Sequence, residues 1–177
     1  FGKITTGVEN IGQTTQTGTT VTFFPDENIF KETIYSFDII DERMRELAYL
    51  NSGISIKLID EREQNKSVKH CFNGGLSEFI IHLDEGRRPI FDDPIKISGE
   101  KENIPVQLAL RYNDSYNETL LTFVNNINTI EGGTHLAGFK TALTRSLNQY
   151  AQKNNLIKPS KGKTLSISGD DTREGLT

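Results

Sequence analysis

The chain has 177 residues, of which 34% are hydrophobic and 25% charged, with a formal net charge of -4. These values are typical of one soluble globular domain, and they argue against a disordered chain and against a strongly basic nucleic-acid-binding protein. The lone Cys71 excludes an internal disulfide and a multi-cysteine zinc site. Because no signal peptide and no apolar run of membrane-spanning length is found, we expect a cytoplasmic protein without membrane contact.

Residues 1–18 predict an extended or disordered arm, because Thr and Gly dominate and apolar periodicity is missing. The start lacks an initiator Met, so we interpret the chain as a piece of a longer protein. One domain is expected over residues 19–177. It would begin with a strand at 19–24, where β-branched and aromatic residues alternate, followed by a turn at "PDEN".

Two helices and a hairpin are expected next. The first helix ends at "NSG", and its apolar face consists of Phe37, Ile40, Met44, Leu47 and Ala48. The segments 54–60 and 68–72 alternate as two strands of a hairpin. The second helix is short, ends at Gly86, and has its apolar residues at Leu76, Phe79, Ile80 and Leu83.

The C-terminal half predicts strands at 106–113 and 118–126, then a long helix from Thr134 to Asn154. We expect this helix to cover one face of the sheet with a stripe made of Leu136, Phe139, Leu143, Leu147 and Tyr150. A short strand at 164–168 would follow. After it, Asp170 or Asp171 could cap a final helix.

The stretch "EGGTHLAG" at the start of the long helix allows two interpretations. The first is a phosphate-binding loop, because glycines let backbone N–H groups approach a phosphate at a helix N-terminus. However, the stretch has neither the Lys-hydroxyl ending of a P-loop nor the three-glycine spacing of a dinucleotide fold. We therefore favour a tight structural turn formed by Gly132, Gly133, Thr134 and His135.

No catalytic, cofactor-binding or metal site is predicted. A small hydrolase that uses His135 with Asp170 or Asp171 is an alternative, but adjacent aspartates cannot both face one point, and capping explains them better. Neither His70 nor His82 has a neighbour at metal-ligand spacing.

Basic side chains gather toward the C-terminal end. On the long helix Lys140 borders the apolar stripe and Arg145 projects from the opposite side. Further lysines follow at Lys153, Lys158, Lys161 and Lys163. Either these form a solvated face, or Lys140 and Arg145 contact DNA phosphates, as in a freestanding weak DNA-binding module.

Three long stretches carry a resemblance to a known family: "RELAYLNSGISIKLID", "FVNNINTIEGGTHLAGFKTALTRSLNQY" and "SGDDTREGLT". Together they resemble the second domain of the ATPase subunits of bacterial type IIA topoisomerases. "LNSG" and "HLAGF" are more similar to the gyrase branch than to topoisomerase IV. The resemblance implies an α+β fold, with a mixed sheet covered by helices and a left-handed βαβ crossover, truncated here at its C-terminal side.

The resemblance also implies a transducer role. Such a domain couples ATP binding and hydrolysis in a GHKL-type domain to DNA strand passage and negative supercoiling. Implied partners are duplex DNA, the gyrase A subunit, the ATP-binding domain and a second copy of the same chain. ATP and Mg²⁺ would serve the full-length enzyme. Neither ATP nor Mg²⁺ is expected to bind this chain, because the resemblance places the family's nucleotide-binding motifs before Phe1 and its Gln-Thr-Lys loop beyond Thr177.

One position differs from the family's usual residue. The residue after "HLAGF" is commonly Arg in gyrases and faces the DNA cavity, but here it is Lys140. Lysine keeps the charge and loses the bidentate fork, so the resemblance implies a weaker phosphate contact.

Overall fold

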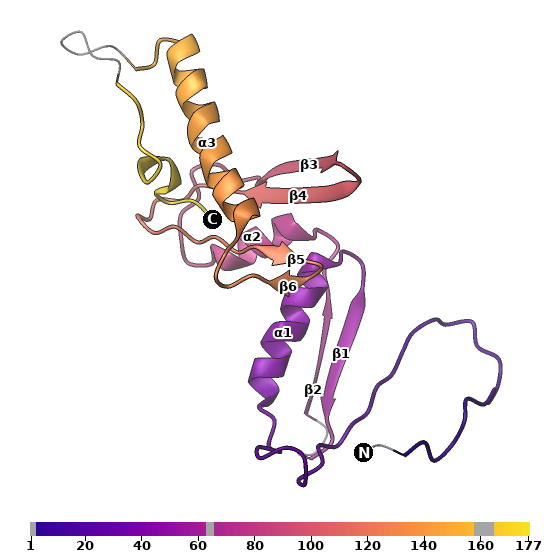
Figure 1. The fold of residues 1–177 in the computed structure, drawn as a ribbon. Helices are drawn as coiled ribbons and strands as arrows, with labels where there is room; N and C mark the ends of the chain where they lie inside the picture. Colours follow the sequence, from indigo (N-terminus) through magenta and orange to yellow (C-terminus); the bar gives the residue numbers. More distant parts are fainter. Residues whose placement is uncertain (1–2, 63–65, 158–164) are drawn as a thin grey trace. The chain divides into compact units, whose positions relative to one another are not determined.

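The computed structural model describes residues 3–62, 66–157 and 165–177. The chain divides into two units, residues 1–35 and 36–177, and the regular elements all belong to the second (Figure 1). No helix within the described ranges combines the length and apolar character needed to cross a bilayer.

The first unit has irregular structure. Its predicted turn at "PDEN" is confirmed, because the Phe30 N–H donates to the Asp26 carbonyl over 2.9 Å. The predicted strand at 19–24 is wrong, since its described residues pair with no other segment. Phe23 instead packs edge-on against Tyr35, with ring centroids 5.4 Å apart. Alternating β-formers make a strand only where a partner supplies ladder hydrogen bonds.

The second unit begins with a helix packed along a hairpin, as predicted. Helix α1 (Phe37–Leu50) contacts both antiparallel strands, β1 (Ser55–Asp60) and β2 (Lys66–Cys71). Alternate β1 side chains, including Ile56 and Leu58, are half-buried, which is the period of two that the sequence showed.

An aromatic stack joins α1, the end of β2 and α2 (Leu76–Leu83). Tyr49 of α1 lies 3.7 Å from Phe72 and 4.9 Å from Phe79 of α2, centroid to centroid. His82 extends the stack at 5.6 Å from Tyr49. These contacts bury the apolar face predicted for the short helix and confirm that helix.

A second hairpin was only half predicted. Strand β4 (Ile104–Leu110) matches most of the expected strand, but its partner β3 (Ile95–Lys101) was missed. The connecting residues Glu102 and Asn103 both have positive φ, 54° and 62°. This is the backbone of a two-residue hairpin turn, and "EN" lacks the glycine that usually marks one.

The strand predicted at 118–126 is mostly irregular. Only β5 (Phe123–Val124) pairs, with β6 (Ile127–Asn128), across a turn in which Asn125 and Asn126 have φ values of 50° and 64°. Asn tolerates this left-handed conformation better than most residues.

Helix α3 (Thr134–Lys153) confirms the long helix but not its expected partner. It packs against the 3₁₀ turn η1 (Asp171–Arg173) rather than covering a sheet face (Figure 1). Tyr150 is 62% exposed and does not belong to the inward stripe. The half-buried or buried positions are Leu136, Phe139, Lys140, Leu143, Thr144, Leu147, Asn148 and Ala151.

The predicted strand at 164–168 is not formed by its described residues, 165–168. The Asn148 side-chain amide bonds both the N–H and the C=O of Ile167, at 2.8 and 2.9 Å. These bonds replace a strand partner. The predicted Asp cap is wrong, because the N-cap residue of η1, Asp170, makes no side-chain cap bond. Instead the Ser168 hydroxyl accepts the Asp171 N–H and the Asp171 carboxylate accepts the Ser168 N–H.

The α+β class is confirmed. Within the described residues the strands form three separate antiparallel pairs, so the implied mixed sheet and left-handed crossover are not present there. Each pair is a local hairpin, and the described residues of the expected strand, 165–168, are bonded through Ile167 by Asn148 of α3 instead.

The glycine pair before α3 lies in a tight turn, in which the Gly132 N–H donates to the Thr129 carbonyl over 2.8 Å. Gly132 has φ 76°, a conformation that L-residues rarely adopt, whereas Gly133, at φ 158°, is close to extended. A Cβ added to Gly133 would lie 2.8 Å from the His135 ring. The turn therefore requires glycine at Gly132 for its backbone, whereas a side chain at Gly133 would have to displace the exposed His135 ring.

A buried carboxylate ties the C-terminus to the second unit. The Asp84 side chain has 0% exposure and accepts hydrogen bonds from Arg111 at 2.8 Å, Asn113 at 3.1 Å and the Thr177 hydroxyl at 2.6 Å. Arg111 and Thr177 also exchange two backbone hydrogen bonds of 2.9 Å. A buried charge needs such compensation, so these segments hold one another in place.

We predict that Asp84→Asn lowers the free energy of unfolding by about 3–5 kcal/mol, because Arg111 keeps a buried charge without its counterion. Urea unfolding measures the effect. Asp38→Asn is the matched control. The Asp38 side chain is 89% exposed and forms a surface ion pair with Lys66 at 3.3 Å. Its loss should lower the free energy of unfolding by less than about 1 kcal/mol. Equal stability of the two variants would contradict the anchoring role of Asp84.

We predict that Gly132→Val lowers the free energy of unfolding by about 1–3 kcal/mol, because valine does not tolerate positive φ. Gly138→Ala is the control: nothing lies within 4 Å of the added Cβ, and within a helix Ala should stabilise by about 0.5–1 kcal/mol. Thermal melts measure both. Wild-type stability of Gly132→Val and of Gly133→Val would show that the turn makes no demand for glycine.

Candidate nucleic-acid interface

Both predicted phosphate-contact candidates lie on α3 and border one open groove. Lys140 and Arg145 line it together with Thr141, Thr144, Gly169 and Arg173, and its volume is about 450 Å³. Arg145 is exposed and also lines a second open groove of about 590 Å³ along the same helix. Five residues apart, the two side chains leave α3 in directions about 140° apart, yet both border this groove, and the fold adds a third cation, Arg173.

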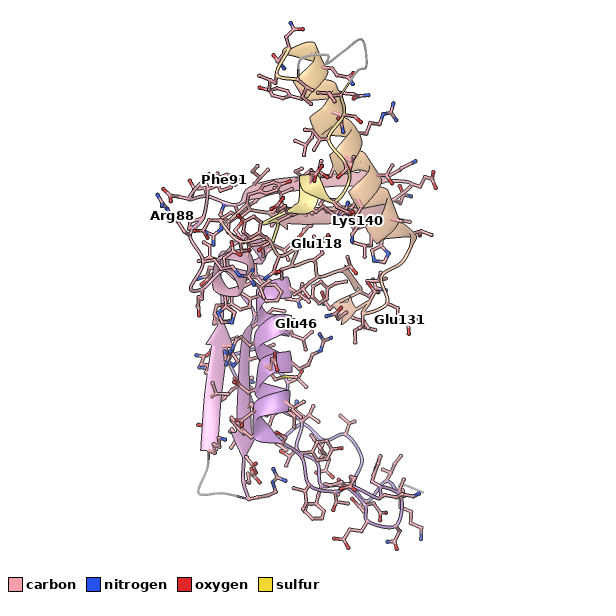
Figure 2. The ribbon with its side chains drawn as sticks, turned by 90° about the vertical axis from the view of Figure 1, so that its left-hand side faces the viewer. Glu46, Arg88, Phe91, Glu118, Glu131 and Lys140 are labelled. Carbon is pink, nitrogen blue, oxygen red and sulfur yellow. The ribbon has the colours of Figure 1, made fainter. Side chains whose placement is uncertain are left out.

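Lys140 is not free in this groove. Its Nζ lies 2.6 Å from Oε1 of Glu118, and the Nε of Arg173 donates to the other oxygen, Oε2, over 2.8 Å. Figure 2 shows Glu118 and Lys140 next to each other. Arg173 also donates to Asp170 over 2.7 Å. One carboxylate therefore bridges two cations from different segments.

The charge state of Glu118 follows from these neighbours. Partial burial alone would raise its pKa, but the hydrogen bonds and positive charges of Lys140 and Arg173 more than offset burial and hold the pKa below its ordinary value. Glu118 is accordingly an anion at neutral pH.

The turn before α3 does not fit a nucleotide triphosphate. His135 Nε2 lies 3.1 Å from the Thr129 hydroxyl, so this ring bonds within the turn. The first basic side chain of α3 is Lys140, and its ammonium is bonded to Glu118. A P-loop needs a lysine that reaches the β- and γ-phosphates, and the described residues of this turn supply none.

The hydrolase alternative lacks its geometry as well. Asp170 bonds to Arg173, Asp171 to Ser168, and His135 to Thr129. The three groups therefore have separate partners, and no acid-base pair forms among them.

Histidines elsewhere bond to carboxylates rather than cluster. His70 lies 2.6 Å from Asp41 and His82 lies 2.9 Å from Glu85. Burial alone would raise the pKa of Asp41, but His70 and Arg45 lower it overall. The described ranges contain no group of three side chains suited to a metal ion.

Glu118 and Arg173 were not recognised from the sequence as parts of the interface. They are 55 residues apart, and no local periodicity connects either of them with α3. Of the other lysines that gave this part of the chain its positive bias, Lys153 is exposed at the end of α3, and Lys158, Lys161 and Lys163 lie outside the described residues.

Comparisons with known proteins give the family. The sequence model of the family DNA gyrase B matches residues 75–177. The DNA gyrase B subunit of Clostridium acetobutylicum is 47% identical over 99% of this chain, which covers 27% of that protein. The Halalkalibacterium halodurans protein of the same name is 47% identical over 96% of the chain and 26% of that protein. The chain thus spans about a quarter of the length of these relatives.

Solved structures agree. The 43K ATPase domain of Thermus thermophilus gyrase B, solved with an aminocoumarin, matches with a TM-score of 0.70 and 37% identity, over 86% of this chain and 40% of that one. The B-subunit of Myxococcus xanthus gyrase matches with a TM-score of 0.71 over 86% of this chain and 41% of that one, and at 24% identity it supports the fold alone. Sequence and fold together show that the chain belongs to the DNA gyrase B family.

Proposed function

We propose that this chain is the transducer domain of a bacterial DNA gyrase B protein. In that role it couples ATP binding and hydrolysis to DNA strand passage and negative supercoiling. The observation that carries the proposal is the match of 99% of the chain, at 47% identity, to about a quarter of a gyrase B protein. A match of this extent is expected of one domain within a multidomain chain.

ATP and Mg²⁺ are proposed to bind in other parts of the full-length enzyme, and the turn before α3 lacks the lysine of a P-loop. The proposed partners are duplex DNA, the gyrase A protein, the ATP-binding domain and a second gyrase B protein, in the cytoplasm. What the chain's own residues supply is a scaffold of hydrogen-bonded segments and, on α3, cations directed at the DNA backbone.

Lys140 and Arg145 support weak contacts to the DNA backbone. Both are cations at one groove, and Lys and Arg contact phosphates irrespective of base sequence. The chain as a whole carries a charge of -4, which opposes tight binding. A domain along which duplexes must move would benefit from such weak, sequence-independent contacts.

We predict that Lys140→Gln and Arg145→Gln each weaken duplex binding and reduce the slope of log affinity against log salt by about one unit, because each removes one phosphate contact. Fluorescence anisotropy at several salt concentrations measures both quantities. Arg88→Gln is the matched control, since it makes the same charge change at an exposed residue away from α3 (Figure 2). Affinities equal to wild type would remove α3 from the DNA-facing surface.

The proposed coupling has its own test in the full-length gyrase B protein combined with the gyrase A protein. We predict that Arg145→Glu lowers ATP-dependent negative supercoiling of plasmid DNA and leaves ATP hydrolysis without DNA unchanged. Arg145 is an exposed residue of α3, and the ATP site is proposed to lie in another domain, so only the DNA contact should suffer. Unchanged supercoiling, or an equal loss of both activities, would contradict coupling through this surface.

A further inference from the structure

The Glu118 carboxylate lies between two cations of the groove proposed to face DNA. Its two oxygens each meet a different cation, Lys140 at 2.6 Å and Arg173 at 2.8 Å. A phosphate group presents two anionic oxygens in much the same way and accepts the same charge-assisted hydrogen bonds. The chain therefore carries its own anion at the surface proposed for DNA.

The charges around the groove show what this contact does. Lys140, Arg145 and Arg173 contribute three cations. Glu118 and Asp170 pair with two of these, Lys140 and Arg173. Arg145 has no ion pair within the described part of the chain, so it alone presents an uncompensated charge to an approaching backbone.

The Glu118 side chain can leave without moving the fold. It belongs to the irregular segment between β4 and β5, and the next residue is fixed, because Thr119 donates its N–H to Leu176 over 2.8 Å and accepts a bond from Arg87. Rotation of the Glu118 side chain is then enough to break its contacts. Both Glu118 and Lys140 are about a third exposed, at 29% and 33%, so water and salt already weaken their attraction.

Arg173 behaves differently from Lys140. Its side chain is only 12% exposed and remains bonded to Asp170 when Glu118 leaves. It would stay in place as a fixed donor, while the flexible Lys140 follows the incoming anion.

We propose that Glu118 is an internal competitor for the DNA backbone, and that a phosphate must displace its carboxylate from between Lys140 and Arg173 before α3 can bind DNA. This rests on the proposed contact of α3 with DNA. Displacement frees Lys140 and the Nε donor of Arg173, which keeps its bond to Asp170. It also breaks the link between α3 and the segment that holds Glu118, so binding would loosen α3 from its neighbour.

The test is a titration of the chain with a short duplex at several salt concentrations. Glu118→Gln removes the competing charge and keeps the side-chain shape. We expect tighter DNA binding at low salt, and a slope of log affinity against log salt steeper by about one unit, since a further cation is free to contact phosphate. Glu118→Asp keeps the charge but shortens the reach, and should bind with an affinity between wild type and Glu118→Gln.

Glu131→Gln is the matched control. Glu131 lies just before α3, is exposed, and has no ion pair among the described residues (Figure 2). It makes the same change in net charge, so any general electrostatic gain is common to both variants. Adding Lys140→Gln to Glu118→Gln should remove most of the specific gain, because the freed cation is then absent.

The outcomes separate the two proposals. If Glu118→Gln binds no better than Glu131→Gln while Arg145→Gln binds more weakly than wild type, Glu118 is no competitor and the DNA-facing surface stands. If Lys140→Gln and Arg145→Gln both bind like wild type, the surface itself is wrong. A thermal melt of each variant confirms that the affinities compare folded proteins.

Discussion

Asp84 places a carboxylate with no exposed surface at the point where α2, the continuation of β4 and the C-terminal residues meet. Its donors are 27, 29 and 93 residues away along the chain, at Arg111, Asn113 and Thr177. Separating any of these segments would leave a charge or a polar group buried without a partner. These buried hydrogen bonds, rather than pairing within a continuous sheet, therefore hold the C-terminal residues against Asp84 and Arg111.

The position of α3 follows from that attachment. Leu176 is held next to Thr119, the neighbour of Glu118, and Tyr112 donates its hydroxyl hydrogen to the Thr172 carbonyl. Thr172 in turn lies 3.1 Å from Thr144 of α3, hydroxyl to hydroxyl. The same contacts that dock the C-terminal segment therefore carry Arg173 and Glu118 to Lys140. The interface depends on the buried anchor although no residue of the anchor belongs to it.

Local patterns predicted the helices and the first hairpin, because the apolar periods of α1, α2, α3 and β1 are set within each segment. They failed where pairing depends on distant residues. The residues at 19–24 alternate correctly yet find no strand partner in the part of the chain that the structure describes, and Ile167, within 165–168, is bonded by Asn148. Candidate cations could be named from α3 alone. The ion pairs of Lys140 and Arg173 with Glu118 could not be predicted, since charge partners far apart in sequence leave no local signal.

A charge-balanced groove suits the proposed transducer role better than a permanently basic one. A strongly basic surface binds DNA tightly and releases it slowly. A domain that takes part in strand passage must bind DNA and also release it within one cycle. Lys140 and Arg173 are bonded to Glu118 without DNA and would be bonded to a phosphate with DNA. The net gain in binding free energy from each new contact is therefore small. It depends on how readily the Glu118 carboxylate returns to its two cations and competes with the phosphate. Any movement of its segment would alter the affinity of α3 for DNA without a change in α3 itself.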